Sequence, residues 1–205
     1  GNSNDIVNAT FGVVAGGSYN YLTGNSNFVG AGRFNVASGT FSSVFSGESN
    51  QSYGLRSAIF SGLQNFVDPL VSDGFIGAGQ LNKLGGSGSI QNSFICGGSS
   101  NRNYAKYSSV LGGVNNFISY SIYHAVIGGG TNNTITKERF NFALADNYNT
   151  LDGNLYPNFF IGGGRDNKIT AFYQYKTTIG SALISIAAGK NVSIIGGNNN
   201  HARYS

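Results

Sequence analysis

A short pattern recurs about every 16 residues from one end of this chain to the other, and it restricts the possible folds more than any other feature. It consists of an apolar residue, any residue, a small residue, Gly, two further residues and Asn. With the Asn as position zero, the copies are marked by Asn4, Asn20, Asn35, Asn50, Asn65, Asn82, Asn101, Asn116, Asn133, Asn149, Asn167, Ser185 and Asn200. Neighbouring marks lie 15 to 19 residues apart. Such a period is typical of stacked structural repeats, and it is too long and irregular for an amphipathic helix.

Four positions of the repeat have a chemistry of their own. Position −6 is Val or Ile in every copy that contains it except one, where it is Ala143, and a β-branched column favours a strand. Position −4 is always Gly, Ala or Ser. Position −3 is Gly apart from Asp146 and Ala182, which indicates a turn with positive φ. Position +2 is often aliphatic, which predicts a second short strand.

These columns predict an all-β fold, a parallel β-solenoid of about 13 short coils of 15–19 residues. Residues 1–205 are expected to form a single repeat domain, and we interpret the chain as a fragment of a longer fibre. The Asn of each coil is expected to close its corner and to form a hydrogen-bonded ladder with the Asn of the next coil. The expected ladder comprises Asn20, Asn35, Asn50, Asn65, Asn82, Asn101, Asn116, Asn133, Asn167 and Asn200.

The strand face opposite to position −6 argues for assembly. Positions −7 and −5 lie on this face and tend to keep one large side chain per coil, as in Phe28 beside Gly30 and Ser43 beside Phe45. A strand that is apolar on both faces must be buried on both, whereas one thin coil covers only one of them. We therefore expect this face to pack against copies of the same chain, most simply as a homotrimer. The alternative is a monomeric solenoid with an exposed, aggregation-prone aromatic stripe.

Two segments carry a family resemblance. FVGAGRFNVASGTFSSVFSGESN (28–50) and VLGGVNNFISYSIYHAVIGGGTNN (110–133) resemble the Gly-Gly-x-x-Asn repeats of YadA-like head domains, which occur in trimeric autotransporter adhesins; similar repeats occur in bacteriophage tail fibres. The resemblance covers nearly all the chain and implies a left-handed parallel β-roll that trimerises, without catalytic residues. The family's usual repeat is shorter and has Ala where this chain has Asn.

Composition excludes several other classes. The 12 Lys and Arg residues are scattered singly, so nucleic acid is not an expected partner despite the net charge of +4. No apolar run approaches the roughly 20 residues of a membrane-spanning helix, and no membrane insertion is expected. Cys96 is the only cysteine, which excludes an intrachain disulfide or a zinc cluster, and we expect it to be a small buried hydrophobe.

Ligand contacts are expected in the irregular coils, because the regular coils of a solenoid act as scaffold. Long or degenerate coils occur between residues 68 and 86 and between residues 137 and 176. Five rings of the second stretch could contact a sugar or a receptor: Tyr148, Tyr156, Phe172, Tyr173 and Tyr175. The alternative is that these rings cap coil edges or fill grooves between chains.

We expect no enzymatic activity, cofactor or metal. Glu138, Asp146, Asp152 and Asp166 form an acidic cluster from which a glycosidase would need a pair, but Asp146 and Asp152 fit turn positions. The expected function is that of a structural or adhesive segment, head or stalk, of an extracellular trimeric fibre on a virion or a bacterial cell surface. Its expected partner is a host-surface glycan or protein receptor. The alternatives are a β-helical fibre that cleaves polysaccharide and a purely mechanical spacer.

Overall fold

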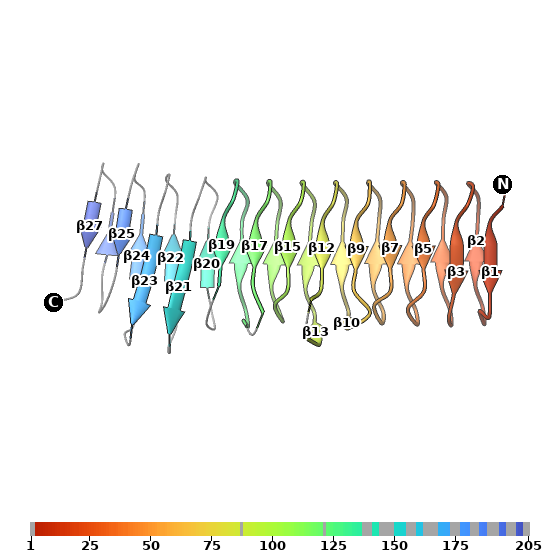
Figure 1. Cartoon of the computed structure of the whole chain (residues 1–205), viewed down its shortest axis with the longest axis horizontal. Helices are drawn as coiled ribbons and strands as arrows, with labels where there is room; N and C mark the ends of the chain where they lie inside the picture. Colours follow the sequence, from red (N-terminus) through yellow and green to blue (C-terminus); the bar gives the residue numbers. More distant parts are fainter. Residues whose placement is uncertain are drawn as a thin grey trace.

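The computed structural model of the chain describes residues 3–86, 88–120 and 122–136, together with residues 141–143, 150–154, 159–161, 168–172, 177–180, 185–187, 193–195 and 200–202. These residues form short strands that are stacked along one axis, with the two ends of the chain at opposite ends of the stack (Figure 1). All strand pairs are parallel, and each strand pairs with its equivalents in the neighbouring coils. The predicted all-β parallel solenoid is confirmed.

Two long sheets run through the stack. The 13-stranded sheet contains β1 (Asp5–Val7), β3 (Tyr21–Thr23), β5 (Val36–Ala37), β7 (Gln51–Ser52), β9 (Phe66–Val67), β12 (Lys83–Leu84), β15 (Arg102–Asn103), β17 (Phe117–Ile118), β19 (Thr134–Ile135), β21 (Thr150–Asn154), β23 (Lys168–Phe172), β25 (Ser185–Ala187) and β27 (Asn200–Ala202). The 12-stranded sheet contains β2 (Val13–Val14), β4 (Phe28–Val29), β6 (Ser43–Val44), β8 (Ala58–Ile59), β11 (Phe75–Ile76), β14 (Phe94–Ile95), β16 (Ser109–Val110), β18 (Val126–Ile127), β20 (Asn141–Ala143), β22 (Phe159–Ile161), β24 (Thr177–Ile179) and β26 (Ser193–Ile194). A third sheet has two strands, β10 (Val71–Ser72) and β13 (Ile90–Gln91).

The strand register follows the sequence repeat even where the coil length changes. Ile76 pairs with Ile95 across the longest step, so position −6 still meets position −6. Lys83 likewise pairs with Arg102, both at position +1. The extra residues of long coils are therefore accommodated outside the two main sheets.

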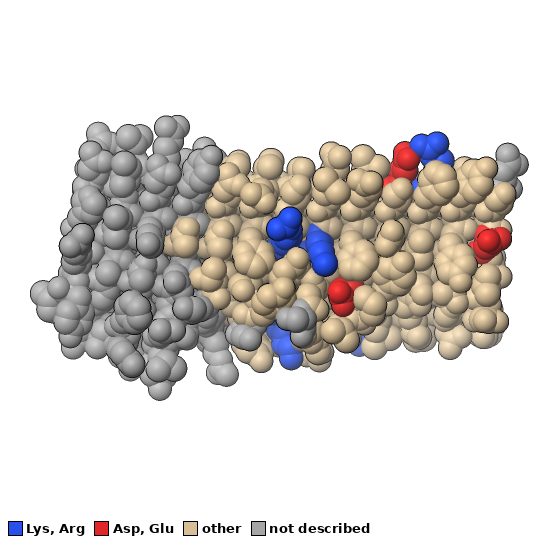
Figure 2. Space-filling model, viewed as in Figure 1, with Lys and Arg blue, Asp and Glu red and all other residues tan. Residues whose placement is uncertain are grey.

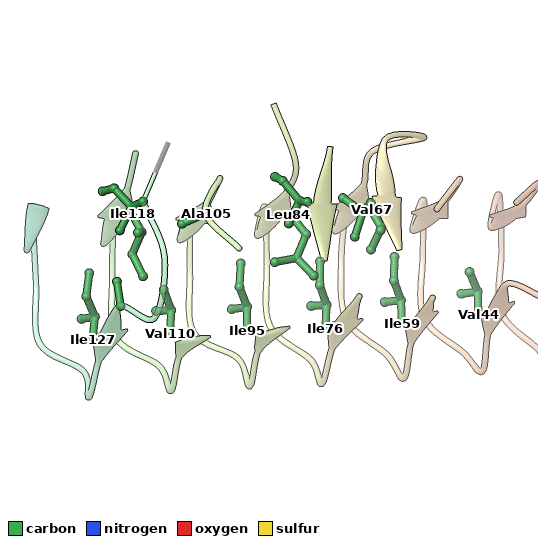
Figure 3. Close-up of a cluster of buried hydrophobic side chains, with 14 of the residues drawn as sticks. Val44, Ile59, Val67, Ile76, Leu84, Ile95, Ala105, Val110, Ile118 and Ile127 are labelled. Carbon is green, nitrogen blue, oxygen red and sulfur yellow. The ribbon is translucent and has the colours of Figure 1, made fainter. Parts of the chain in front are cut away.

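The interior is a narrow seam between the two sheets. Position −6 of the 12-stranded sheet and position +2 of the 13-stranded sheet point toward each other, as Ile76 and Leu84 do in Figure 3, and both residues are fully buried. Each sheet contributes one side chain per coil to this seam. Where position +2 is polar, the group is satisfied inside the coil: the Ser52 hydroxyl lies 2.9 Å from that of Ser57. The interior thus uses one face of each sheet and leaves the other face outside.

One edge of the solenoid is closed by the Asn column. The backbone N–H of each Asn from Asn20 to Asn133 donates to the Oδ1 of the preceding coil's Asn at 3.0 Å. In Asn65, the side-chain amide donates to the carbonyl oxygens of Ser61 at 3.1 Å and Gly79 at 2.9 Å. We call this edge the ladder corner. Asn167 and the side chain of Asn200 lie outside the described part of the chain.

The Gly at position −3 is required for two reasons. From Gly17 to Gly130 its φ lies between 82° and 107°, as the sequence predicted. In addition, a Cβ on Gly62 would overlap the backbone carbonyl oxygen of Gly79 in the next coil. The coils therefore approach each other at this corner through bare backbone.

Two features of the corners were not predicted. Position −1 also has positive φ although it is rarely Gly, as in Phe34 at 57° and Leu81 at 56°. This conformation directs the N–H to the preceding coil, where Leu81 donates to the Leu63 carbonyl at 2.9 Å. The second feature is a small, mostly buried residue at position −8, such as Ser57, which lines the edge opposite to the ladder corner.

Candidate functional site

The outer face of the 12-stranded sheet carries a continuous row of rings. We call Phe28, Phe45, Phe60, Phe75 and Phe94 the aromatic row. Phe45 is 42% exposed and Phe60 is 50% exposed. Their ring centres lie 4.6 Å apart and the rings are stacked. Leu111, 47% exposed, continues the apolar surface into the next coil.

The alternation between positions −7 and −5 brings rings of neighbouring coils into contact. Phe28 at −7 and Phe45 at −5 lie 5.4 Å apart, and Phe60 at −5 meets Phe75 at −7 edge-on at 5.4 Å. Gly30 makes room for this packing, because a Cβ there would lie 3.2 Å from the Phe28 ring. The exchange of large and small residues that the sequence shows thus produces one stripe of touching rings.

No charged residue interrupts this face between Val13 and Gly128. Cys96 lies on it and is exposed, so the prediction of a buried Cys96 was wrong. The physical reason is the period of two along a strand: position −5 points away from position −6, and only −6 faces the interior. An apolar stripe of this length on the surface is characteristic of an interaction site.

The edge opposite to the ladder corner varies in length from coil to coil. Residues 85–92 and 119–124 form long connections between the two main sheets, whereas residues 104–107 form a short one between them. Buried Val71, Ile90 and Ile122 fill the space beneath the long connections. The short connection therefore lies lower than its neighbours, and we call the resulting depression the notch.

The notch is a cavity of about 240 Å³ lined by Gly88, Ser89, Ile90, Tyr104, Lys106, Tyr120, Ile122 and Tyr123. Tyr104 and Tyr120 are stacked, with ring centres 5.0 Å apart, and Phe117 meets the Tyr104 ring edge-on at 5.5 Å. Lys106 holds its Nζ 5.9 Å from the centre of the Tyr123 ring. The walls thus combine aromatic rings, phenol hydroxyls and one ammonium group.

The charges around the notch are mainly positive. Lys83 places its Nζ 5.8 Å from the centre of the Tyr104 ring, and Arg102 lies one coil further along the same sheet. The nearest acid, Asp68, accepts a hydrogen bond from the Leu70 backbone N–H at 3.0 Å. Burial raises the pKa of the Tyr104 phenol, so this group is a hydrogen-bond donor at neutral pH. Figure 2 shows how few charged groups the described surface on this side carries in total.

The predicted ligand-contact residues lie elsewhere. Tyr148, Tyr156, Tyr173 and Tyr175 are outside the described residues, and Phe172 ends β23 with only its backbone described. Tyr104, Tyr120 and Lys106 were not predicted as site residues. The signal for them was present in the spacing of the Asn marks, where a step of 15 follows one of 19 and precedes one of 17.

Within the described ranges, no group of three or more His, Cys, Asp or Glu side chains could hold a metal ion. In the same ranges, no helix has the length and apolarity to cross a membrane. Two ion pairs lie at the corners instead: Arg33 with Glu48 at 2.6 Å, and Arg56 with Asp73 at 2.7 Å.

Comparison with models of known protein families finds no family that matches this chain, and comparison with curated proteins finds no significant match. The function is therefore inferred from the residues and their geometry.

Proposed function

We propose that this chain is a segment of a homotrimeric β-solenoid fibre, exposed on a virion or a bacterial cell surface, that displays a surface for contact with a host glycan or receptor. The observation that carries the proposal is the aromatic row. It lies on a regular sheet face without charges, and five coils in succession contribute a Phe to it.

The row favours self-association for energetic reasons. A Phe buries 150–250 Å² when covered, at roughly 25 cal/mol per Å², so covering a half-exposed ring contributes on the order of 2 kcal/mol. The seam between the sheets already uses the inner face, and no further layer of this chain covers Phe45 or Phe60 in the described structure. A second copy with the same row at the same spacing is the simplest cover. Three copies around one axis, rather than two, are favoured by the resemblance to trimeric fibres.

The test is the mass of the purified chain in solution, measured by light scattering over a dilution series. A trimer mass that persists on dilution is expected. The double variant Phe45→Ser with Phe60→Ser should dissociate, because both replaced rings belong to the row. Phe34→Ser is the matched control, since Phe34 is equally exposed at 46% but lies at the ladder corner, stacked on Tyr19. A monomer mass with an intact β-type circular dichroism spectrum would overturn the proposal.

The notch favours ligand contact over a purely mechanical role, because a spacer needs no recess with aromatic walls. A fibre that cleaves polysaccharide receives no support from a described residue, as Glu138, Asp146 and Asp166 lie outside the described part and Asp152 is described only as a backbone position in β21.

A further inference from the structure

We propose that the notch binds one acidic sugar unit of a surface glycan, a pyranose ring that carries a carboxylate. This inference rests on the proposed function and specifies the ligand class of the displayed surface. It is carried by the shape of the notch, the chemistry of its walls and the sign of its charges.

The notch is formed by rigid parts of the fold. Its floor, residues 104–106, is held to the next coil by the Tyr104 N–H on the Ile118 carbonyl at 2.9 Å and the Lys106 N–H on the Ile122 carbonyl at 3.1 Å. Buried Ile90 and Ile122 anchor the two walls, with exposed fractions of 2% and 1%. A recess between three hydrogen-bonded coils keeps its form without a ligand, which reduces the entropic cost of binding.

The walls suit a sugar ring. Tyr120 uses one ring face against Tyr104 and is still 42% exposed, so it presents ring surface to solvent. The C–H groups of a pyranose pack on such a surface, and its hydroxyls pair with phenol and backbone groups. The volume of about 240 Å³ is below the usual 300–1,000 Å³ of drug-sized pockets, which favours a single ring over an oligosaccharide.

The charges favour an anion. No carboxylate lines the notch, and Lys106 forms no ion pair with a carboxylate in residues 3–136, where the ion pairs are Arg33–Glu48 and Arg56–Asp73. An ammonium group beside a half-enclosed, aromatic recess interacts more strongly with a carboxylate than it would on an open surface. A neutral sugar would leave this cation without a partner.

The notch and the aromatic row share no residue. The row lies on the 12-stranded sheet, whereas the notch lies at the edge beside the 13-stranded sheet. Failure of glycan binding and failure of trimer formation can therefore be observed separately.

The experiment is ligand-observed saturation-transfer NMR on the full chain, with the methyl glycosides of glucuronic acid and N-acetylneuraminic acid as probes and methyl glucoside as the neutral counterpart of the glucuronide. We expect at least one acidic glycoside to bind, and methyl glucoside to bind roughly tenfold more weakly than methyl glucuronide or not at all. Lys106→Gln should weaken binding of the acidic glycoside roughly tenfold. Tyr120→Ala should weaken every glycoside that binds, whereas Tyr120→Phe should retain binding.

Arg33→Gln, a change of charge at the ladder corner, is the control and should leave binding unchanged. Circular dichroism and the solution mass of each variant establish that it is folded and assembled. A trimer that binds neither acidic glycoside overturns this inference alone, and so does equal binding of glucuronide and glucoside or binding that Lys106→Gln leaves unaltered. A monomer overturns the proposed function whatever the binding result.

Discussion

The two edges of the solenoid are built from the same repeat and behave differently. At the ladder corner, every coil from Asn20 to Asn133 forms the same hydrogen bond to the preceding coil at 3.0 Å. At the opposite edge, the connection is short at residues 38–41 and 104–107 and longer at residues 68–73, 85–92 and 119–124. Only the second edge contains a recess.

The difference follows from what fills each edge. The ladder corner brings backbone against backbone, since a Cβ on Gly79 would overlap the Gly98 carbonyl oxygen, and no length change is possible there without breaking the contact. The variable edge is held by side chains that point outward, such as Tyr107 stacked on His124 with ring centres 5.2 Å apart. Such pairs tolerate insertions, so a solenoid of this kind separates a constant scaffold from an edge that can acquire a site.

The largest effect is expected at the ladder Gly. Gly113→Ala should destabilise the fold by roughly 4 kcal/mol, because φ is 89° and the new Cβ would overlap the Gly130 carbonyl oxygen. Gly112→Ala, one residue earlier, should be nearly neutral, as its Cβ would have no atom within 4 Å. Urea unfolding followed by circular dichroism measures both. Equal effects of the two substitutions would show that the close backbone contact is not what keeps this corner constant.

A smaller effect is expected when one buried polar residue is removed from each edge. Asn65→Ala should cost about 3 kcal/mol, because the Asn82 N–H loses its acceptor at 3.0 Å and two carbonyl oxygens lose a donor. Ser57→Ala should cost only about 1 kcal/mol, since it removes the bonds to the Gly54 carbonyl at 2.8 Å and the Ser52 hydroxyl. The same unfolding measurement compares them. If Ser57→Ala is the more damaging change, the proposed ranking of the two edges is wrong.

The smallest effect is expected from the Arg56–Asp73 pair at the variable edge, which is exposed to solvent. The Arg56 guanidinium lowers the pKa of Asp73 below its ordinary value of 3.8. The pair therefore stabilises the fold above that ordinary pKa, and the contribution is lost as the pH falls through the lowered pKa of the folded state. Asp73→Asn should remove this part of the acid sensitivity, and Asn retains tolerance of the positive φ of 59°.

The measurement for this pair is the urea midpoint of wild type and Asp73→Asn from pH 5 down to pH 2, in low and in high salt. Their difference should shrink on acidification and in high salt, because salt screens exposed charges. Arg56→Gln should reproduce the loss, and the double variant should add little to it. A difference that persists at the lowest pH would contradict the assignment.

Much of the scaffold could be predicted from the sequence. The branched column at position −6, the Gly at −3 and the spacing of the Asn residues predicted the strands, their parallel stacking and the turn with positive φ. The positive φ at Phe34 and Leu81 could not be predicted, because such residues disfavour this conformation in isolation and adopt it here only to reach a carbonyl of the preceding coil. The small residue at position −8 was overlooked, since Gly, Ala, Ser and Asn alternate there without an obvious pattern.

The sequence by itself determined the repeat, and with it which strands pair, which side chains enter the seam and where the aromatic row lies. A periodic pattern is sufficient for this because equivalent residues of successive coils are forced into register by the backbone hydrogen bonds. The tertiary structure alone decided that Cys96 is exposed, how the corners close and where the notch opens. A recess depends on the heights of three neighbouring coils at once, so it is a property of their stacking and of no single stretch of sequence.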